Sequence, residues 1–191
     1  MKNAITLLCF IVSLVGYTQN EANIAAKMLD TWHKAAASAD FQNYFSKMTE
    51  DAIFIGTDPT ENWNKTEFKS FSKPYFDKGK AWEFIPFERH VYVQNNFAWF
   101  DELLNSKHMG ICRGSGVLIK VNGQWLVKHY VLSLSIPNEN MKEIVPLKAK
   151  FEEKLLERLD TAVEHRDLPE SCKNEILDEI KAYLEIAEII S

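Results

Sequence analysis

The sequence has no surplus of positive charge and no cluster of basic residues. Its 22 Lys and Arg residues are outnumbered by 27 Asp and Glu residues, which gives a formal net charge of −5. Because binding to a phosphate backbone needs a basic surface, nucleic acid is excluded as an expected partner. Low-complexity segments and convincing internal repeats are lacking as well. The 191 residues, 46% of them hydrophobic, are therefore expected to build one ordinary core.

Motifs for metal binding and for nucleophilic catalysis are also missing. The five histidines are scattered, with neither a His-Glu-x-x-His pair nor a Cys-x-x-Cys pair, so we expect no metal site and no cofactor. Ser115 lies between two glycines, but on an expected strand and without the spacing of a nucleophile elbow. The pattern Ser70-x-x-Lys73 lacks the partner motifs that would give it a catalytic meaning.

Only one long apolar run is present, and it lies at the N-terminus. Residues 4–15 are uncharged and apolar, Lys2 precedes them, and the small or polar residues 16–19 follow. This order is typical of a signal peptide, whereas a membrane anchor would need roughly 20 apolar residues. We predict a bacterial signal peptide over residues 1–19, a secreted or periplasmic location, and no membrane attachment after its removal.

Cysteine is scarce, with three in the chain. Cys9 lies inside the apolar run rather than after it, which argues against a lipoprotein processing site. Removal of the signal leaves Cys112 and Cys172. These two either form a disulfide in an oxidising compartment or are small buried side chains.

Two kinds of hydrophobic pattern divide the rest of the chain. Helical spacing of apolar residues marks segments 21–37, 41–48 and 65–77. The last of these begins with a capping pair, Asn64 and Glu67. Strand patterns follow at 52–55, 82–93, 97–104, 112–121 and 124–136. Helices that precede an antiparallel meander predict an α+β domain over residues 20–138, with the helices on one face of the sheet.

Residues 139–191 return to the helical pattern. Leu147 and Leu155 recur along one expected helix, and Ile176 and Ile180 along a second. An αα-hairpin is therefore expected as a C-terminal helical extension. It either packs on the outer face of the sheet or forms a dimer contact, and the sequence leaves both open.

The Asn122-Gly123 turn decides which side chains share a face of the sheet. A two-residue turn would pair Lys120 with Trp125. A three-residue loop with a glycine bulge would instead pair Ser115 with His129 and separate apolar from polar residues more cleanly. We therefore predict the bulged loop, with Arg113, Ser115 and His129 on the face that Trp125 and Val127 make apolar.

Several segments together resemble a known family. They are GTDPTENW at 56–63, AWFDE at 98–102, RGSGVL at 113–118, NGQW at 122–125 and SIPN at 135–138. The most specific part is Gly123, followed by Trp125 and, four residues later, His129. Over residues 24–138 the chain is similar to bacterial SnoaL-like proteins of the nuclear transport factor 2-like superfamily.

The resemblance implies a cone-shaped fold in which helices and a curved antiparallel sheet enclose a pocket. The N-terminal helices are then expected on the concave face of the sheet. The superfamily includes isomerases, cyclases, dehydratases and non-catalytic scaffolds, so the fold does not settle the chemistry. The ketosteroid isomerase pattern of a tyrosine and two acids is not recognisable here by motif.

Asp101 and His129 are the candidate catalytic pair. Alternation along the strand places Asp101 on the same face as Trp99, and an apolar pocket would raise the pKa of such a carboxyl group. His129, beyond Arg113, would exchange the proton. The alternatives are a structural ion pair between Asp101 and Arg113 and a satisfied core histidine at position 129.

Further residues are candidates for contacts with a ligand. They combine aromatic surface with polar groups near the expected pocket: Trp32, Tyr44, Asp58, Trp63, Trp99, Arg113 and Ser115. Asp58 and Trp63 belong to a loop at the expected mouth of the cone, where they could contact a ligand. An aspartate that stabilises a turn and a tryptophan that covers the core explain the two residues equally well. The helix-borne aromatics Trp32 and Tyr44 are first of all packing residues.

Two functions follow from these patterns. The first is an exported pocket protein that binds a small, largely apolar molecule, and Asp101 and His129 would make it an acid/base lyase or isomerase. The second is a non-catalytic binding or scaffold module with a structural Asp101–Arg113 pair. A homodimer is expected in either case. Whether the protein is an enzyme stays open.

Overall fold

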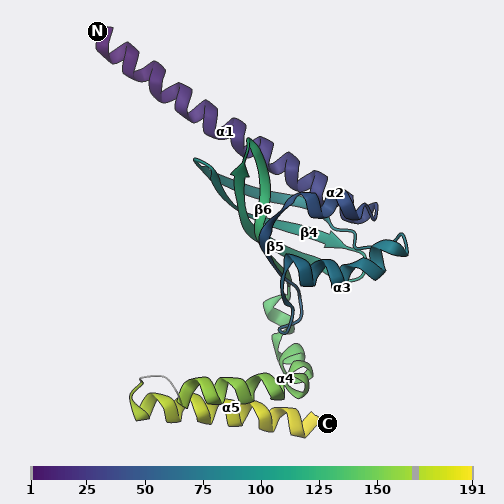
Figure 1. The fold of residues 1–191 in the computed structure, drawn as a ribbon. Coiled ribbons are helices and arrows are strands. Elements are labelled where there is room, and N and C mark those ends of the chain that lie inside the picture. The colour runs from purple at the N-terminus through teal and green to yellow at the C-terminus, as the bar shows by residue number, and fades with distance from the viewer. Residues whose placement is uncertain (1, 165–167, 191) are drawn as a thin grey trace. The chain divides into compact units, whose positions relative to one another are not determined.

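The computed structural model describes residues 2–164 and 168–190, and the chain forms two compact units, residues 1–135 and 136–191 (Figure 1). The first unit contains three helices and a curved sheet, and the second contains a helical hairpin. Each unit is described by itself.

The first unit is an α+β domain, as predicted. Its helices are α1 Lys2–Ala37, α2 Phe41–Ser46 and α3 Lys65–Asp77, and its strands are β1 Met48–Ile55, β2 Asn62–Asn64, β3 Ile85–Gln94, β4 Phe97–Ser106, β5 Gly110–Val121 and β6 Gln124–Leu134. The six strands lie in the order β2-β1-β6-β5-β4-β3. All neighbours are antiparallel except β1 and β6, which are parallel. The helices cover one face of the sheet (Figure 1). The short strand β2 was not predicted.

Local sequence signals explain the start of α3. The Asn64 side chain accepts hydrogen bonds from the backbone N–H groups of Thr66 and Glu67, at 2.9 and 3.0 Å. The Glu67 carboxylate accepts one from the backbone N–H of Asn64 at 2.9 Å. This reciprocal capping satisfies the free N–H groups of the first helical turn, and it confirms the predicted helix start.

The turn between β5 and β6 differs from the prediction. Lys120 pairs with Trp125 and Val121 with Gln124, so the loop has two residues and the predicted three-residue loop is wrong. Asn122 and Gly123 have φ values of 51° and 81°. A two-residue hairpin turn of this type needs positive φ at both positions, which Asn-Gly supplies at little cost.

A bulge farther along β6 then changes the face that each residue occupies. Leu118 pairs with Val127 but Val117 pairs with His129, so Lys128 is the extra residue. Trp125 and Val127 are buried before the bulge, and Tyr130 and Leu132 after it. His129 is therefore turned to the opposite, outer face of the sheet, because a one-residue slip reverses the alternation.

The second unit is the predicted αα-hairpin. A short turn of 3-10 helix, Asn138–Asn140, precedes α4 Met141–Glu164 and α5 Glu170–Ile190. Within this unit Ala149 and Val163 on α4 and Ile180 on α5 are buried. None of the helices among the described residues has a stretch long and apolar enough to cross a membrane.

Candidate functional site

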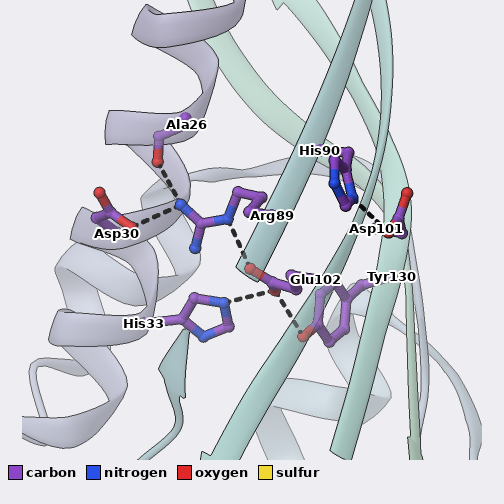
Figure 2. Close-up of polar contacts among 8 residues, drawn as sticks. All are labelled: Ala26, Asp30, His33, Arg89, His90, Asp101, Glu102 and Tyr130. Atoms are coloured by element: carbon purple, nitrogen blue, oxygen red, sulfur yellow. Dashed lines mark hydrogen bonds and ion pairs between the residues drawn. The ribbon is translucent and has the colours of Figure 1, made fainter. Parts of the chain in front are cut away.

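A carboxylate lies inside the cone at the centre of a polar cluster (Figure 2). Glu102 projects from β4, and its side chain is fully buried. Its Oε1 atom lies 2.7 Å from Nε2 of His33 on α1, and it accepts a hydrogen bond from the Tyr130 hydroxyl on β6 at 3.1 Å. Nε of Arg89 on β3 donates to Oε2 at 2.7 Å. One acid therefore connects the first helix to three strands.

Arg89 extends this cluster toward the surface of α1. One terminal nitrogen donates to the backbone oxygen of Ala26 at 2.9 Å and to the Asp30 carboxylate at 2.6 Å. The other, Nη2, is buried and has no hydrogen-bond partner among the described residues. A guanidinium group held on two sides in this way is fixed in orientation.

Burial and neighbouring charges shift the pKa of Glu102 in opposite directions. Burial alone would raise the pKa of its carboxyl group, but the hydrogen bonds and charges of His33 and Arg89 outweigh burial and hold that pKa below its ordinary value. Burial, followed by the nearby Glu102 charge, raises the pKa of the Tyr130 hydroxyl well above its usual range. At neutral pH the cluster therefore contains an ionised Glu102–Arg89 pair and a neutral tyrosine.

His33 lies at the edge of this cluster. Its side chain is 6% exposed and lines a cleft of about 280 Å³ together with Asp30, Lys34 and Phe84. Its second nitrogen, Nδ1, points away from Glu102 (Figure 2). The Glu102 carboxylate fixes the plane of the His33 ring. The arrangement can therefore hold Nδ1 as a hydrogen-bonding nitrogen at the side of the cleft.

Aromatic rings fill the rest of the interior. Trp32 stacks on Tyr44 with ring centroids 4.9 Å apart and meets the Tyr130 ring edge-on at 4.9 Å. Phe54 stacks on Phe68 at 3.9 Å. These rings and the Glu102 cluster pack together in the core.

A second open space in the described part of the domain lies between β1, α3 and the segment that leads into β3. A cavity of about 130 Å³ is lined mainly by aromatic residues, namely Phe54, Trp63, Phe68, Phe71, Trp82 and Phe84, with Gly56, Thr57, Glu61, Met109 and Leu132. We call it the aromatic cavity. A cleft of about 600 Å³ shares Phe71, Trp82 and Met109 with it. Apolar lining with few polar groups is typical of small-molecule sites.

The structure places the predicted catalytic pair outside the cone. Asp101 is exposed and lies 3.1 Å from Nδ1 of His90, rather than pairing with Arg113. Arg113 lies opposite Leu103 and Ser133, and His129 lies opposite Val117. The prediction that Asp101 and His129 face the interior is wrong, because the Lys128 bulge and the alternation of β4 direct both to the outer face.

The predicted ligand contacts divide into three groups. Trp99, Arg113 and Ser115 lie on the outer face with Asp101. Trp32 and Tyr44 are buried packing residues, 1% exposed each. Trp63 lines the aromatic cavity, as the mouth position suggested.

The remaining predicted ligand contact, Asp58, belongs to a turn beside the aromatic cavity. Its carboxylate accepts hydrogen bonds from the backbone N–H and the hydroxyl of Thr60, at 2.8 and 2.5 Å. Such hydrogen bonds are those with which an aspartate side chain stabilises a turn.

Sequence reasoning missed the buried acid and its partners. Glu102 stands between Phe100 and Leu104 on β4, so the alternation Ala98-Phe100-Glu102-Leu104 was the available signal. The opposite face of the same strand also begins with aromatic residues, Phe97 and Trp99. Nothing within the strand itself therefore tells which face turns inward.

Comparison with solved structures shows an NTF2-like fold. An NTF2-like protein of unknown function from Pseudomonas putida KT2440 has a TM-score of 0.55 at 14% identity, over 64% of this chain and 92% of its own. A Streptomyces avermitilis protein described as a candidate dehydratase of the NTF2-like family has a TM-score of 0.54 at 13% identity, over 62% and 99%. An NTF2-like protein from Cytophaga hutchinsonii has 0.51 at 14%, over 59% and 97%.

The family follows from the sequence match. The chain belongs to the SnoaL-like domain family, whose model matches residues 25–137, more than half of its length. The resemblance inferred from the sequence is confirmed. None of the curated proteins matches the chain.

Proposed function

We propose that the protein binds a small, largely apolar, ring-containing molecule in the aromatic cavity. The observation that carries this proposal is the lining of six aromatic side chains with only Thr57 and Glu61 as polar side chains. Trp63 and Phe71 stack with centroids 4.3 Å apart, which supplies a flat surface beside the cavity. A dry interior cavity of roughly 150 Å³ accepts benzene. The size therefore suits one ring, and the adjoining cleft suits the rest of a larger molecule.

The proposal is one of binding rather than of catalysis at Asp101 and His129, because those residues lie on the outer face. Export remains part of it. The prediction of export rests on the charge and apolar pattern of residues 1–19. Cell fractionation with N-terminal sequencing of the mature protein tests this prediction.

Filling the aromatic cavity is expected to weaken binding of the ligand strongly. Leu132→Phe adds a ring into the lining and should weaken binding of 3-phenylpropan-1-ol, measured by ligand-detected NMR, at least tenfold. Val131→Phe is the matched control, since it makes a similar change at the next residue on the outer face. Equal binding by both variants and the wild type, or no binding by the wild type, would contradict the proposal.

A second candidate function is a dimeric module, and the outer sheet face favours it. Tyr92, Phe97 and Trp99 are 43–47% exposed and contiguous, with Tyr92 stacked on Trp99 at 5.5 Å. Contiguous exposed aromatic surface marks interaction sites, and a two-fold dimer uses the same patch on both copies. The same face also carries Asp101 and Arg113, so two copies can place opposite charges against each other.

The oligomeric state tests this candidate. We expect the wild-type chain to have a dimeric molar mass by light scattering and Trp99→Glu to have a monomeric one, because a buried carboxylate in the interface would be unpaired. Leu147→Glu, an exposed position of the helical extension, is the matched control. A dimer that survives Trp99→Glu but not Leu147→Glu would move the interface to the extension, and a monomeric wild type would end the proposal.

A further inference from the structure

The 600 Å³ cleft beside the aromatic cavity has a charged side as well as an apolar one. Phe71, Trp82 and Met109 line both spaces, so the cleft and the aromatic cavity adjoin each other. A molecule whose ring occupies the aromatic cavity would extend into this cleft.

The charged side of the cleft comes from two loops at the same end of the sheet. Lys80 follows α3, where Gly79 with φ 69° ends the helix. Lys107 and His108 belong to the turn between β4 and β5, which ends at Gly110 with φ 68°. The positive φ values are turn positions that glycine adopts readily, and they reverse the chain at the rim of the cleft.

In the part of the chain that the structure describes, both lysines lack a partner of opposite charge. Lys65, Lys73, Lys120 and Lys128 each form an ion pair with an acid. Among the described residues, by contrast, neither Lys80 nor Lys107 forms an ion pair. Glu83 is the one acid among the residues that line the cleft. Two unpaired lysines and a histidine therefore gather at one concave surface, in a chain whose net charge is −5.

We propose that the rim of this cleft is an anion subsite and that the ligand of the aromatic cavity carries a carboxylate. The inference rests on the proposed binding function and names its substrate class: a single ring joined through a short apolar linker to a carboxylate. The ring packs against Trp63, Phe71 and Trp82. The carboxylate lies between Lys80 and Lys107, and the His108 ring adds a hydrogen-bond donor.

Three probes of the same shape distinguish binding in the aromatic cavity from binding at the anion subsite. They are 3-phenylpropanoate, 3-phenylpropan-1-ol and 3-phenylpropylammonium, which differ only in the charge of the end group. Because the lysines are exposed, we expect the carboxylate to bind roughly threefold to thirtyfold more tightly than the alcohol, and the ammonium more weakly than either. The preference should shrink at high ionic strength.

The double variant Lys80→Gln/Lys107→Gln should bind the alcohol as the wild type does and lose its preference for the carboxylate. Lys69→Gln/Lys73→Gln is the matched control, since it removes the same charge from α3 outside the cleft. A wild type that binds carboxylate and alcohol equally would overturn the anion subsite and leave the binding function intact. An equal loss of the carboxylate preference in both double variants would also overturn the anion subsite and leave the binding function intact. A wild type that binds none of the probes would overturn both.

Discussion

Replacing Glu102 with alanine is expected to lower the free energy of unfolding by about 3–5 kcal/mol, because it leaves the buried Arg89 charge without its main partner. His33 and Tyr130 lose a hydrogen-bond acceptor in the same step, since both contact Oε1. Urea unfolding followed by circular dichroism measures the loss.

Asp101→Ala is the matched control for this change. It removes an acid from the adjacent position of β4, but the Asp101 side chain is 52% exposed and pairs with a half-exposed histidine. We expect a loss below about 1 kcal/mol. Equal losses for the two variants would show that the buried Glu102 cluster stabilises the fold no more than the exposed Asp101–His90 pair does.

The same cluster sets the response to acid. The pKa of Glu102 in the folded state lies below its ordinary value of 4.5, so the unfolded chain takes up a proton first as the pH falls. The contribution of Glu102 to the free energy of unfolding is therefore present at neutral pH. It declines below about pH 4.5 and is lost as the pH falls through the pKa of Glu102 in the folded state. Glu102→Ala should accordingly unfold with a shallower pH dependence than the wild type below that pH.

Replacing Trp32 with alanine should cost about 3–5 kcal/mol of unfolding free energy. Trp32 is 1% exposed, and its ring contacts His33, Tyr44 and Tyr130. Truncation would leave a cavity at the junction of α1, α2 and β6, where rigid rings surround it and collapse only partly. Thermal unfolding by calorimetry or circular dichroism provides the measurement.

Trp32→Phe distinguishes packing from hydrogen bonding at this position. The indole nitrogen is buried and has no partner among the described residues, so phenylalanine forfeits no hydrogen bond and retains most of the stacking on Tyr44. We expect a loss of roughly 1–2 kcal/mol, less than half that of the alanine variant. A phenylalanine variant as unstable as the alanine variant would mean that the indole nitrogen has a role that packing does not explain.

Features that depend on near neighbours were predictable from the sequence. The start of α3 follows from Asn64 and Glu67, which are three residues apart and satisfy each other's backbone groups. The α+β class follows from helical periods that precede alternating ones, and the helical hairpin of residues 136–191 from its two amphipathic segments. Each of these signals is complete within a few turns of helix or one strand.

The candidate site was less predictable, because its partners are far apart in sequence. His33 and Glu102 are separated by 69 residues and Tyr130 follows Glu102 by 28. Asp101 and Glu102 are adjacent acids on opposite faces of β4, and the apolar residues around both made either face a plausible interior. The cleaner separation of apolar from polar residues favoured the wrong loop at Asn122-Gly123, because the bulge that restores this separation lies at Lys128, five residues after Gly123.

The sequence by itself determined the family, the α+β class and nearly all elements, because these depend on periodicity and local capping. It also suggested Trp63 for the mouth of the pocket, and Trp63 lines the aromatic cavity. Only the tertiary structure decided which face of the sheet is the interior. The packing of α1 against β3 turns Glu102 inward and Asp101 outward, and the bulge in β6 turns His129 outward, whereas strand alternation alone is symmetric between the two faces.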